Sequence, residues 1–148
     1  METMDRQRDR SFELMRRITT AQTRAGERWI HERDISLEQG FILGYLRDNP
    51  GSIQRDVARE LQRGEANVSS MLQKLERRLL VERRLEKGND RIKRVYATAA
   101  GLALIDGLDA VMAAVDEDIL APITRSERAA LIVLLDKIAA RLPDYPRW

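Results

Sequence analysis

The sequence predicts a mainly α-helical fold that carries one small β-hairpin. Three observations indicate this class. Both ends of the chain have the apolar spacing of long helices, and residues 53–78 have the pattern of two short ones. Residues 80–85 and 93–97 have strand character and flank the turn sequence Gly88-Asn89-Asp90. A helix pair followed by a hairpin is the layout of a winged helix-turn-helix lobe, here with helices on both sides.

Length and composition exclude several classes of protein. The chain has 148 residues, which suits one domain with or without an appended oligomerisation element. It has no cysteine, so disulfides, thiol nucleophiles and cysteine-based zinc sites are excluded. One histidine, no glycine-rich phosphate loop and no convergent carboxylate pair argue against an enzyme, and no metal or cofactor is expected. Residues 1–10 are charged and no run approaches a membrane span, so we expect a cytoplasmic protein.

The first half of the chain is expected to begin with a helix over residues 10–30, which Gly26 weakens and bends. Ser36 is the predicted N-cap of a second helix, and Asn49-Pro50-Gly51 ends it. Ser52 is the predicted N-cap of a helix over residues 53–61. Gly64 is expected to adopt a positive φ in the connection to a helix over residues 66–78.

The second half is expected to hold one long helix from Thr98 to about residue 120, and a last helix over residues 126–142. Thr124 and Glu127 fit a capping box at its start. Residues 131–135 are all apolar and cover more than one helix face, which favours burial against a second subunit. The alternative is that this helix forms the core of a monomer. The predicted parts are therefore residues 1–34 and 99–148 for dimerisation and residues 35–98 for the winged lobe.

The helix over residues 66–78 has two chemically different faces. A helical wheel places Val68, Leu72, Leu75 and Leu79 inward. Its outward face is small and hydrogen-bonding, with two cations: Ala66, Ser70, Gln73 and Arg77, flanked by Asn67, Ser69 and Lys74. Small residues allow close approach to a major groove, and amides, hydroxyls and cations can bond base edges or phosphates. The alternative is an ordinary solvated face, although Asn and Ser are poor choices there.

The basic charge of the chain is concentrated around the hairpin. Residues 51–100 hold 12 Lys and Arg against 7 Asp and Glu, whereas residues 101–148 hold 5 against 8. Arg91, near the hairpin tip, is the best candidate to enter a minor groove or to clamp a phosphate. Because strand side chains alternate between faces, the six cations of the hairpin cannot all reach one partner. The alternative is an edge hairpin that charge protects against aggregation.

Together these patterns predict binding to duplex DNA. The predicted contacts are Arg55, Ala66, Asn67, Ser69, Ser70, Gln73, Lys74, Arg77, Lys87, Asn89, Arg91 and Lys93. A protein-interaction module of the same fold, without operator specificity, is the alternative. It predicts salt-insensitive contact with duplex, whereas a DNA-binding regulator loses affinity steeply as salt rises.

From Ile35 to Gly101 the chain resembles the MarR family of bacterial transcription regulators. The matching segments include Ser36-Leu37-Glu38-Gln39, Gly51-Ser52-Ile53-Gln54, Leu80-Val81-Glu82-Arg83 and Val95-Tyr96-Ala97-Thr98. The resemblance implies a homodimer with interleaved terminal helices and two lobes on a palindromic operator. It also implies repression of nearby genes, released by a small effector that is often aromatic and anionic.

Two positions depart from the family pattern, and an effector site is only weakly indicated. Asn89 stands where the family usually has the first aspartate of Asp-x-Arg, and Leu79 stands where it usually has glycine. Leu79 is expected to change the end of the reading helix and to lengthen it by about one residue. Trp29 and His31 are candidates for contact with an aromatic acid. The alternative, which we favour, is that Trp29 is packed and His31 is solvated.

Overall fold

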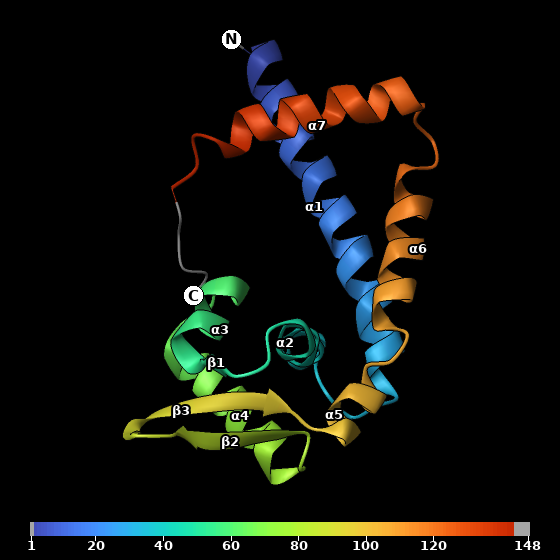
Figure 1. Cartoon of the computed structure of the whole chain (residues 1–148). Coiled ribbons are helices and arrows are strands. Elements are labelled where there is room, and N and C mark those ends of the chain that lie inside the picture. The colour runs from blue at the N-terminus through green and yellow to red at the C-terminus, as the bar shows by residue number, and fades with distance from the viewer. Residues whose placement is uncertain (1, 144–148) are drawn as a thin grey trace.

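The computed structural model describes residues 2–143, without side chains for residues 2, 3 and 90. Its elements, in chain order, are α1 (Glu2–His31), α2 (Leu37–Asp48), β1 (Ser52–Ile53), α3 (Gln54–Leu61), α4 (Glu65–Arg77), β2 (Val81–Glu86), β3 (Asn89–Ala97), α5 (Ala99–Leu104), α6 (Leu108–Leu120) and α7 (Arg125–Ala139). Figure 1 shows a lobe built from α2 to β3, which α5 adjoins and beside which α1 and α6 rise side by side. The expected fold class is confirmed.

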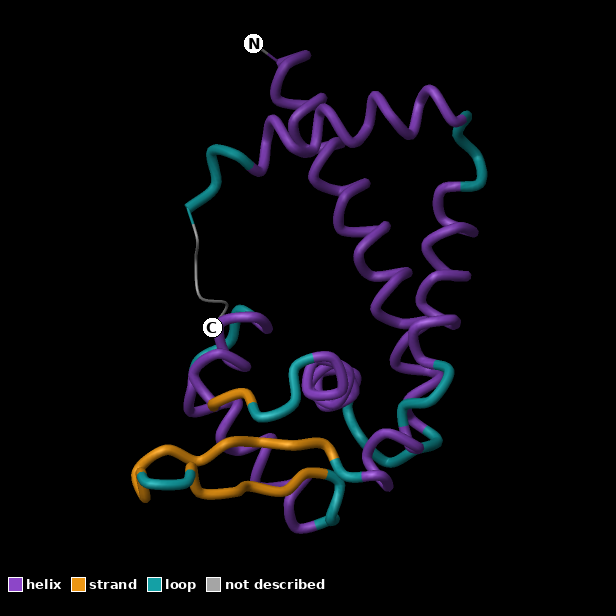
Figure 2. Tube along the Cα trace, in the orientation of Figure 1, coloured by secondary structure: helices purple, strands orange, loops and turns teal. Residues whose placement is uncertain are grey.

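The winged lobe encloses the hydrophobic core. Its antiparallel sheet has the strand order β1-β3-β2, and β2 and β3 project as a wing (Figure 2). Helices α2, α3 and α4 pack against the sheet because each presents an apolar stripe. The core side chains that are at most 2% exposed are Ile30, Ile42, Leu43, Leu46, Val57, Val68, Leu72, Leu75, Val81, Val95 and Ile105. Burial of such side chains stabilises the lobe by about 1.5–3 kcal/mol each.

Three predicted helix caps are present. Ser36 Oγ accepts from the backbone N–H of Gln39, 3.1 Å away, and Gln39 Oε1 accepts from the backbone N–H of Ser36 at 2.9 Å. Thr124 and Glu127 form the same reciprocal box at the start of α7. Thr98 Oγ1 accepts from the backbone N–H of Gly101 and starts α5. Each cap satisfies helix N–H groups that lack an intrahelical partner.

Two predictions for the helix-turn-helix connections were wrong. Ser52 does not cap α3, because Ser52 and Ile53 form strand β1 and pair with Val95 and Arg94. Gly64 does not take a positive φ: its φ is −64°, and it precedes α4 as the N-cap residue. The left-handed position of this connection falls two residues earlier, at Gln62, with φ 50°.

The end of α4 also differs from the prediction. The helix ends at Arg77, and Leu79 adopts φ 60°, the left-handed conformation that glycine takes most easily. Leu79 therefore does not pack inward: its side chain is 74% exposed, and Leu80 enters the core instead. The backbone N–H of Leu80 donates to the Leu75 carbonyl at 2.9 Å, so the turn closes without glycine.

The terminal helices differ in extent from the prediction. Helix α1 is longer than expected and continues through Gly26, against whose Cα Leu37 and Met112 pack closely. The expected single helix over residues 98–120 is broken into α5 and α6. Gly107 allows the break because it adopts φ 90°.

Several apolar side chains on the terminal helices are exposed, with no covering partner among the described residues. None of the residues of α7 is buried, and Ile132, Val133 and Leu134 are each at least 59% exposed. On α1, Phe12 and Ile18 are more than half exposed. These exposures exclude the alternative of a monomer core helix. No helix within residues 2–143 is long and apolar enough to span a bilayer.

The last turn of α4 is tied to the end of α1. The Arg78 guanidinium donates to the backbone carbonyls of Asp34 and, at 3.3 Å, of Arg33. Arg33 in turn lies over the Trp29 ring, 3.4 Å from its centroid, and donates to the Trp29 carbonyl at 2.7 Å. These contacts join the helix-turn-helix to the long helix that leaves the lobe.

Candidate nucleic-acid interface

Helix α4 presents a polar face to solvent because its apolar residues hold the opposite face in the core. Val68, Leu72 and Leu75 are 0% exposed. The residues on the far side are exposed: Ala66, Asn67, Ser70, Gln73, Lys74 and Arg77. Ser69, which was predicted to flank this face, is only half-exposed. Asn67 is the third residue of the helix and not its N-cap, so capping does not explain its presence.

The wing tip is organised by Asn89. Its Oδ1 accepts a hydrogen bond from the backbone N–H of Arg91 at 3.1 Å, and Gly88 turns the chain with φ 87°. Asn89 therefore fixes the backbone of the tip and does not bond the Arg91 guanidinium. The side chains of Lys87, Arg91 and Lys93 are exposed and remain available to a partner.

The cations of the wing divide between the two faces of the sheet. Arg84 pairs with Glu82 and lies over the Tyr96 ring, 4.4 Å from its centroid. Arg94 Nη2 donates to Glu86 Oε1 at 2.6 Å, and this hydrogen bond raises the pKa of Arg94. Arg84 and Arg94 therefore have partners within the sheet.

The other face of the wing opens into a basic pocket of about 320 Å³. It lies between the wing and the first turn of α3, and its lining is Ile53, Gln54, Arg55, Arg83, Arg91, Ile92, Lys93 and Val95. Arg55, Arg91 and Lys93 were predicted contacts, and the structure brings them together. Gln54 and Arg83 were missed. The alternation of strand residues could have placed Arg83, because it lies two residues from buried Val81.

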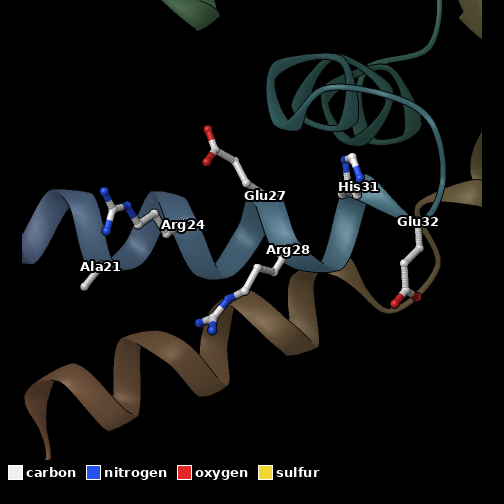
Figure 3. Close-up of a pocket in the computed structure, with 6 residues that line it drawn as sticks. All are labelled: Ala21, Arg24, Glu27, Arg28, His31 and Glu32. Carbon is white, nitrogen blue, oxygen red and sulfur yellow. The ribbon is translucent and has the colours of Figure 1, made fainter.

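Trp29 and His31, the candidates for effector contact, do not share one site. Trp29 is half-buried and packs against the core, whereas His31 is exposed. A surface depression of about 600 Å³ runs along α1 and is lined by Ala21, Arg24, Glu27, Arg28, His31 and Glu32. Figure 3 shows Glu27 and Arg28 leaving α1 in opposite directions, so these side chains do not converge on a ligand. No metal-binding group of acidic or histidine side chains occurs among the residues that the structure describes.

A helix-turn-helix whose second helix carries an exposed hydrogen-bonding face, beside a cationic wing, defines a DNA-binding protein of the winged helix-turn-helix class. Residues 33–92 match the model of the MarR family. The transcriptional regulator HosA of Escherichia coli O157:H7 is 26% identical over 132 residues, which cover 88% of this chain and 96% of HosA. Over these residues the chain is similar to the MarR family, and the comparisons support a DNA-binding transcription regulator.

Solved structures agree with this assignment. MepR of S. aureus in a complex with DNA superposes with a TM-score of 0.79 at 27% identity, covering 88% of this chain and 96% of MepR. A mutant of MarR from E. coli, complexed with operator DNA, has a TM-score of 0.75 at 21% identity, covering 88% and 92% of the two chains. The second likeness concerns the fold alone.

Proposed function

We propose that the exposed face of α4 reads operator sequence in the major groove. The observation that carries this proposal is the row of exposed Asn67, Ser70 and Gln73 opposite the fully buried Val68 and Leu72. The amides of Asn67 and Gln73 match the N6 and N7 edge of adenine, and the hydroxyl of Ser70 serves either base edge. Ala66 and Ser70 keep this face thin enough for close approach.

The cations around this face anchor the lobe to the DNA backbone. Lys74 and Arg77 lie on the C-terminal half of α4, where they reach phosphate or guanine. Arg91 and Lys87 extend from the wing toward the neighbouring minor groove or its phosphates. These contacts fix the register of the lobe, and the amides and the hydroxyl read the sequence.

We further propose that the protein works as a homodimer on a palindromic operator. The apolar residues exposed on α1 and α7 support this proposal, because soluble monomers rarely expose such apolar patches and a second subunit would bury them. Residues 1–34 and 99–148 then form the dimerisation region, and residues 35–98 form the lobe. A two-fold dimer places its α4 helices about one DNA turn, roughly 34 Å, apart or a multiple of it.

We propose that the protein represses transcription. We also propose that it acts in the cytoplasm, where the chromosome is accessible to it. Release by a small aromatic or anionic effector is part of the same proposal and follows the family resemblance. The stacking of Arg33 on Trp29 favours a packing role for Trp29, so the effector contact is better sought at His31. The DNA complex of a relative favours this function over a protein-interaction module.

The proposal is tested by selecting bound sites from random duplexes and by measuring their affinity against salt concentration. We expect a palindromic consensus and a steep loss of affinity with salt. Gln73→Ala should cost about 1–3 kcal/mol at particular base pairs only. An equal loss on every duplex would show that Gln73 positions the helix without reading sequence. No consensus, together with salt-insensitive binding, would favour the protein-interaction module.

A further inference from the structure

The basic pocket between the wing and α3 has no assigned ligand. Four cations line it, namely Arg55, Arg83, Arg91 and Lys93, and no carboxylate is among its lining residues within the described part of the chain. We propose that this pocket binds one phosphate group of the DNA backbone in each half-site, with Arg83 as its innermost cation. This inference rests on the proposed function and adds a site and a residue to it.

The strand register explains how Arg83 reaches this position. Arg83 pairs with Val95 across β2 and β3, and Val81 on the same face is 2% exposed. The face that holds Arg83 is therefore the inner face of the sheet, directed toward the helices. Lys93 lies two residues before Val95 on β3 and joins the same pocket. The side chain of Arg83 is only 17% exposed, although it carries a full charge.

Arg83 has more hydrogen-bonding capacity than its neighbours satisfy. Its Nε lies 3.2 Å from Glu76 Oε2 in an ion pair, and its Nη1 donates to Gln54 Oε1 over a long 3.5 Å. Its Nε and Nη2 are buried without a hydrogen bond among the described residues. Arg55, Arg91 and Lys93 form no ion pair with any side chain that the structure describes. An oxyanion in the pocket would supply both the missing charge and the missing acceptors.

The first turn of α3 adds backbone donors to the pocket. Ile53 is the N-cap of this helix and makes no side-chain cap, so the first N–H groups of the helix have no side-chain acceptor there. Ile53, Gln54 and Arg55 line the pocket. Free N–H groups at a helix N-terminus, together with the positive end of the helix dipole, favour phosphate. A tetrahedral phosphate has enough acceptor oxygens to engage guanidinium, ammonium and peptide donors at once.

The pocket lies where a backbone phosphate can reach it while α4 occupies the groove. Gln54 Nε2 donates to the carbonyl of Glu65 at 3.4 Å, so the floor of the pocket is joined to the first residue of α4. On its other side the pocket is bounded by Arg91, near the wing tip. A phosphate bound here would fix the wing and the reading helix relative to one DNA strand.

The test uses the full-length protein and its selected operator, with single methylphosphonate linkages scanned along each strand. A methylphosphonate removes one phosphate charge at a known position. In the wild type, one linkage per half-site should weaken binding on the order of tenfold through the pocket. Arg83→Gln should bind the unmodified duplex about tenfold more weakly, with a salt slope flatter by about one unit per half-site. It should show no further loss at that linkage.

Arg84→Gln is the matched control, because it removes the same charge from the adjacent residue on the opposite face of the wing. It should retain the wild-type affinity and the wild-type methylphosphonate profile. Arg83→Lys should keep the salt slope, because it keeps the charge. If Arg83→Gln proves unstable by thermal unfolding, Arg55→Gln provides the same test from an exposed position of the pocket.

Separate outcomes overturn the pocket and the function. The phosphate pocket is refuted if Arg83→Gln binds the operator with wild-type affinity. It is also refuted if Arg83→Gln and Arg55→Gln lose as much affinity as the wild type at every methylphosphonate. Either result leaves sequence reading by α4 intact. Absence of salt-dependent duplex binding by the wild type overturns the proposed function itself. Inorganic phosphate is titrated separately, with the Arg83 Nε–H resonance as the readout. Saturation at low millimolar phosphate, with no effect of any methylphosphonate, would mean a free-anion site and overturn the pocket as a DNA contact.

Discussion

Leu79 lies in a backbone conformation that disfavours every residue with a β-carbon. Its φ is 60°, and this left-handed geometry costs a residue other than glycine roughly 1–2 kcal/mol. The side chain gives little in return, because it is 74% exposed. Leu79→Gly removes the strain but raises the entropy of the unfolded chain, which costs about 0.4–1 kcal/mol. We expect a net gain of about 1 kcal/mol in the free energy of unfolding.

The assay is urea denaturation followed by circular dichroism, at one fixed protein concentration for all variants because association contributes to stability. Leu79→Ala is the control, since it removes the exposed apolar group and keeps the β-carbon. It should stay within about 0.5 kcal/mol of the wild type. If Leu79→Ala gains as much as Leu79→Gly, the apolar exposure is the cause and the strain argument is refuted. No gain in either variant would refute it as well.

Three further predictions follow from the same structure. Arg91→Ala should weaken binding to every duplex and flatten the salt slope by roughly one unit, and an unchanged slope in filter binding would remove it from the interface. Gly101→Ala should destabilise the lobe by about 1–3 kcal/mol in urea denaturation, because the added β-carbon would lie 2.2 Å from the Leu80 carbonyl oxygen. Gly44→Ala is the control: its β-carbon would meet open space, so it should stabilise the lobe by about 0.5–1 kcal/mol. The hydrogen bond from the backbone N–H of Thr124 lowers the pKa of Glu127 in the folded protein. The ionised Glu127 therefore stabilises the fold above the pKa that it has in the unfolded chain, and this stabilisation is lost as the pH falls through its pKa in the folded protein. Glu127→Gln should therefore flatten the fall of Tm below about pH 5, and an identical acid slope would contradict this.

The sequence predicted those features that depend on local chemistry. Ser36 and Thr124 act as the expected caps, because a capping box is completed within four residues. Val68, Leu72 and Leu75 lie inward as the helical wheel indicated, because the apolar stripe determines which face is buried. The exposed face of α4 follows directly from that burial. The fold class and the reading helix were accordingly within reach of the sequence alone.

The errors occurred where distant parts of the chain decide the conformation. Ser52 looks like a cap, but its strand partner Val95 lies 43 residues further along the chain, beyond any local pattern. A helical wheel directs Leu79 inward only if the helix continues past Arg77, and periodicity does not report where a helix ends. Strand alternation puts Arg83 on the same face as Val81, but the pairing of β2 with β3 is what brings it into the pocket with Arg55.

The absence of buried side chains on α7 sets a lower limit on the amount of protein at which the regulator can work. Within one chain the last helix is held by its cap, by its own hydrogen bonds and by an ion pair in which Arg128 Nη1 lies 2.9 Å from Glu117 Oε2 of α6. A helix of 15 residues is marginal in water on those terms. In the proposed homodimer the second subunit would cover this helix, so that folding of the helix and association would form one equilibrium. At protein concentrations below the dissociation constant of the dimer, each lobe would bind its half-site alone and lose the extra affinity that two linked lobes have for two half-sites. Occupancy of the operator should consequently fall more steeply on dilution of the protein than a simple one-to-one binding curve predicts.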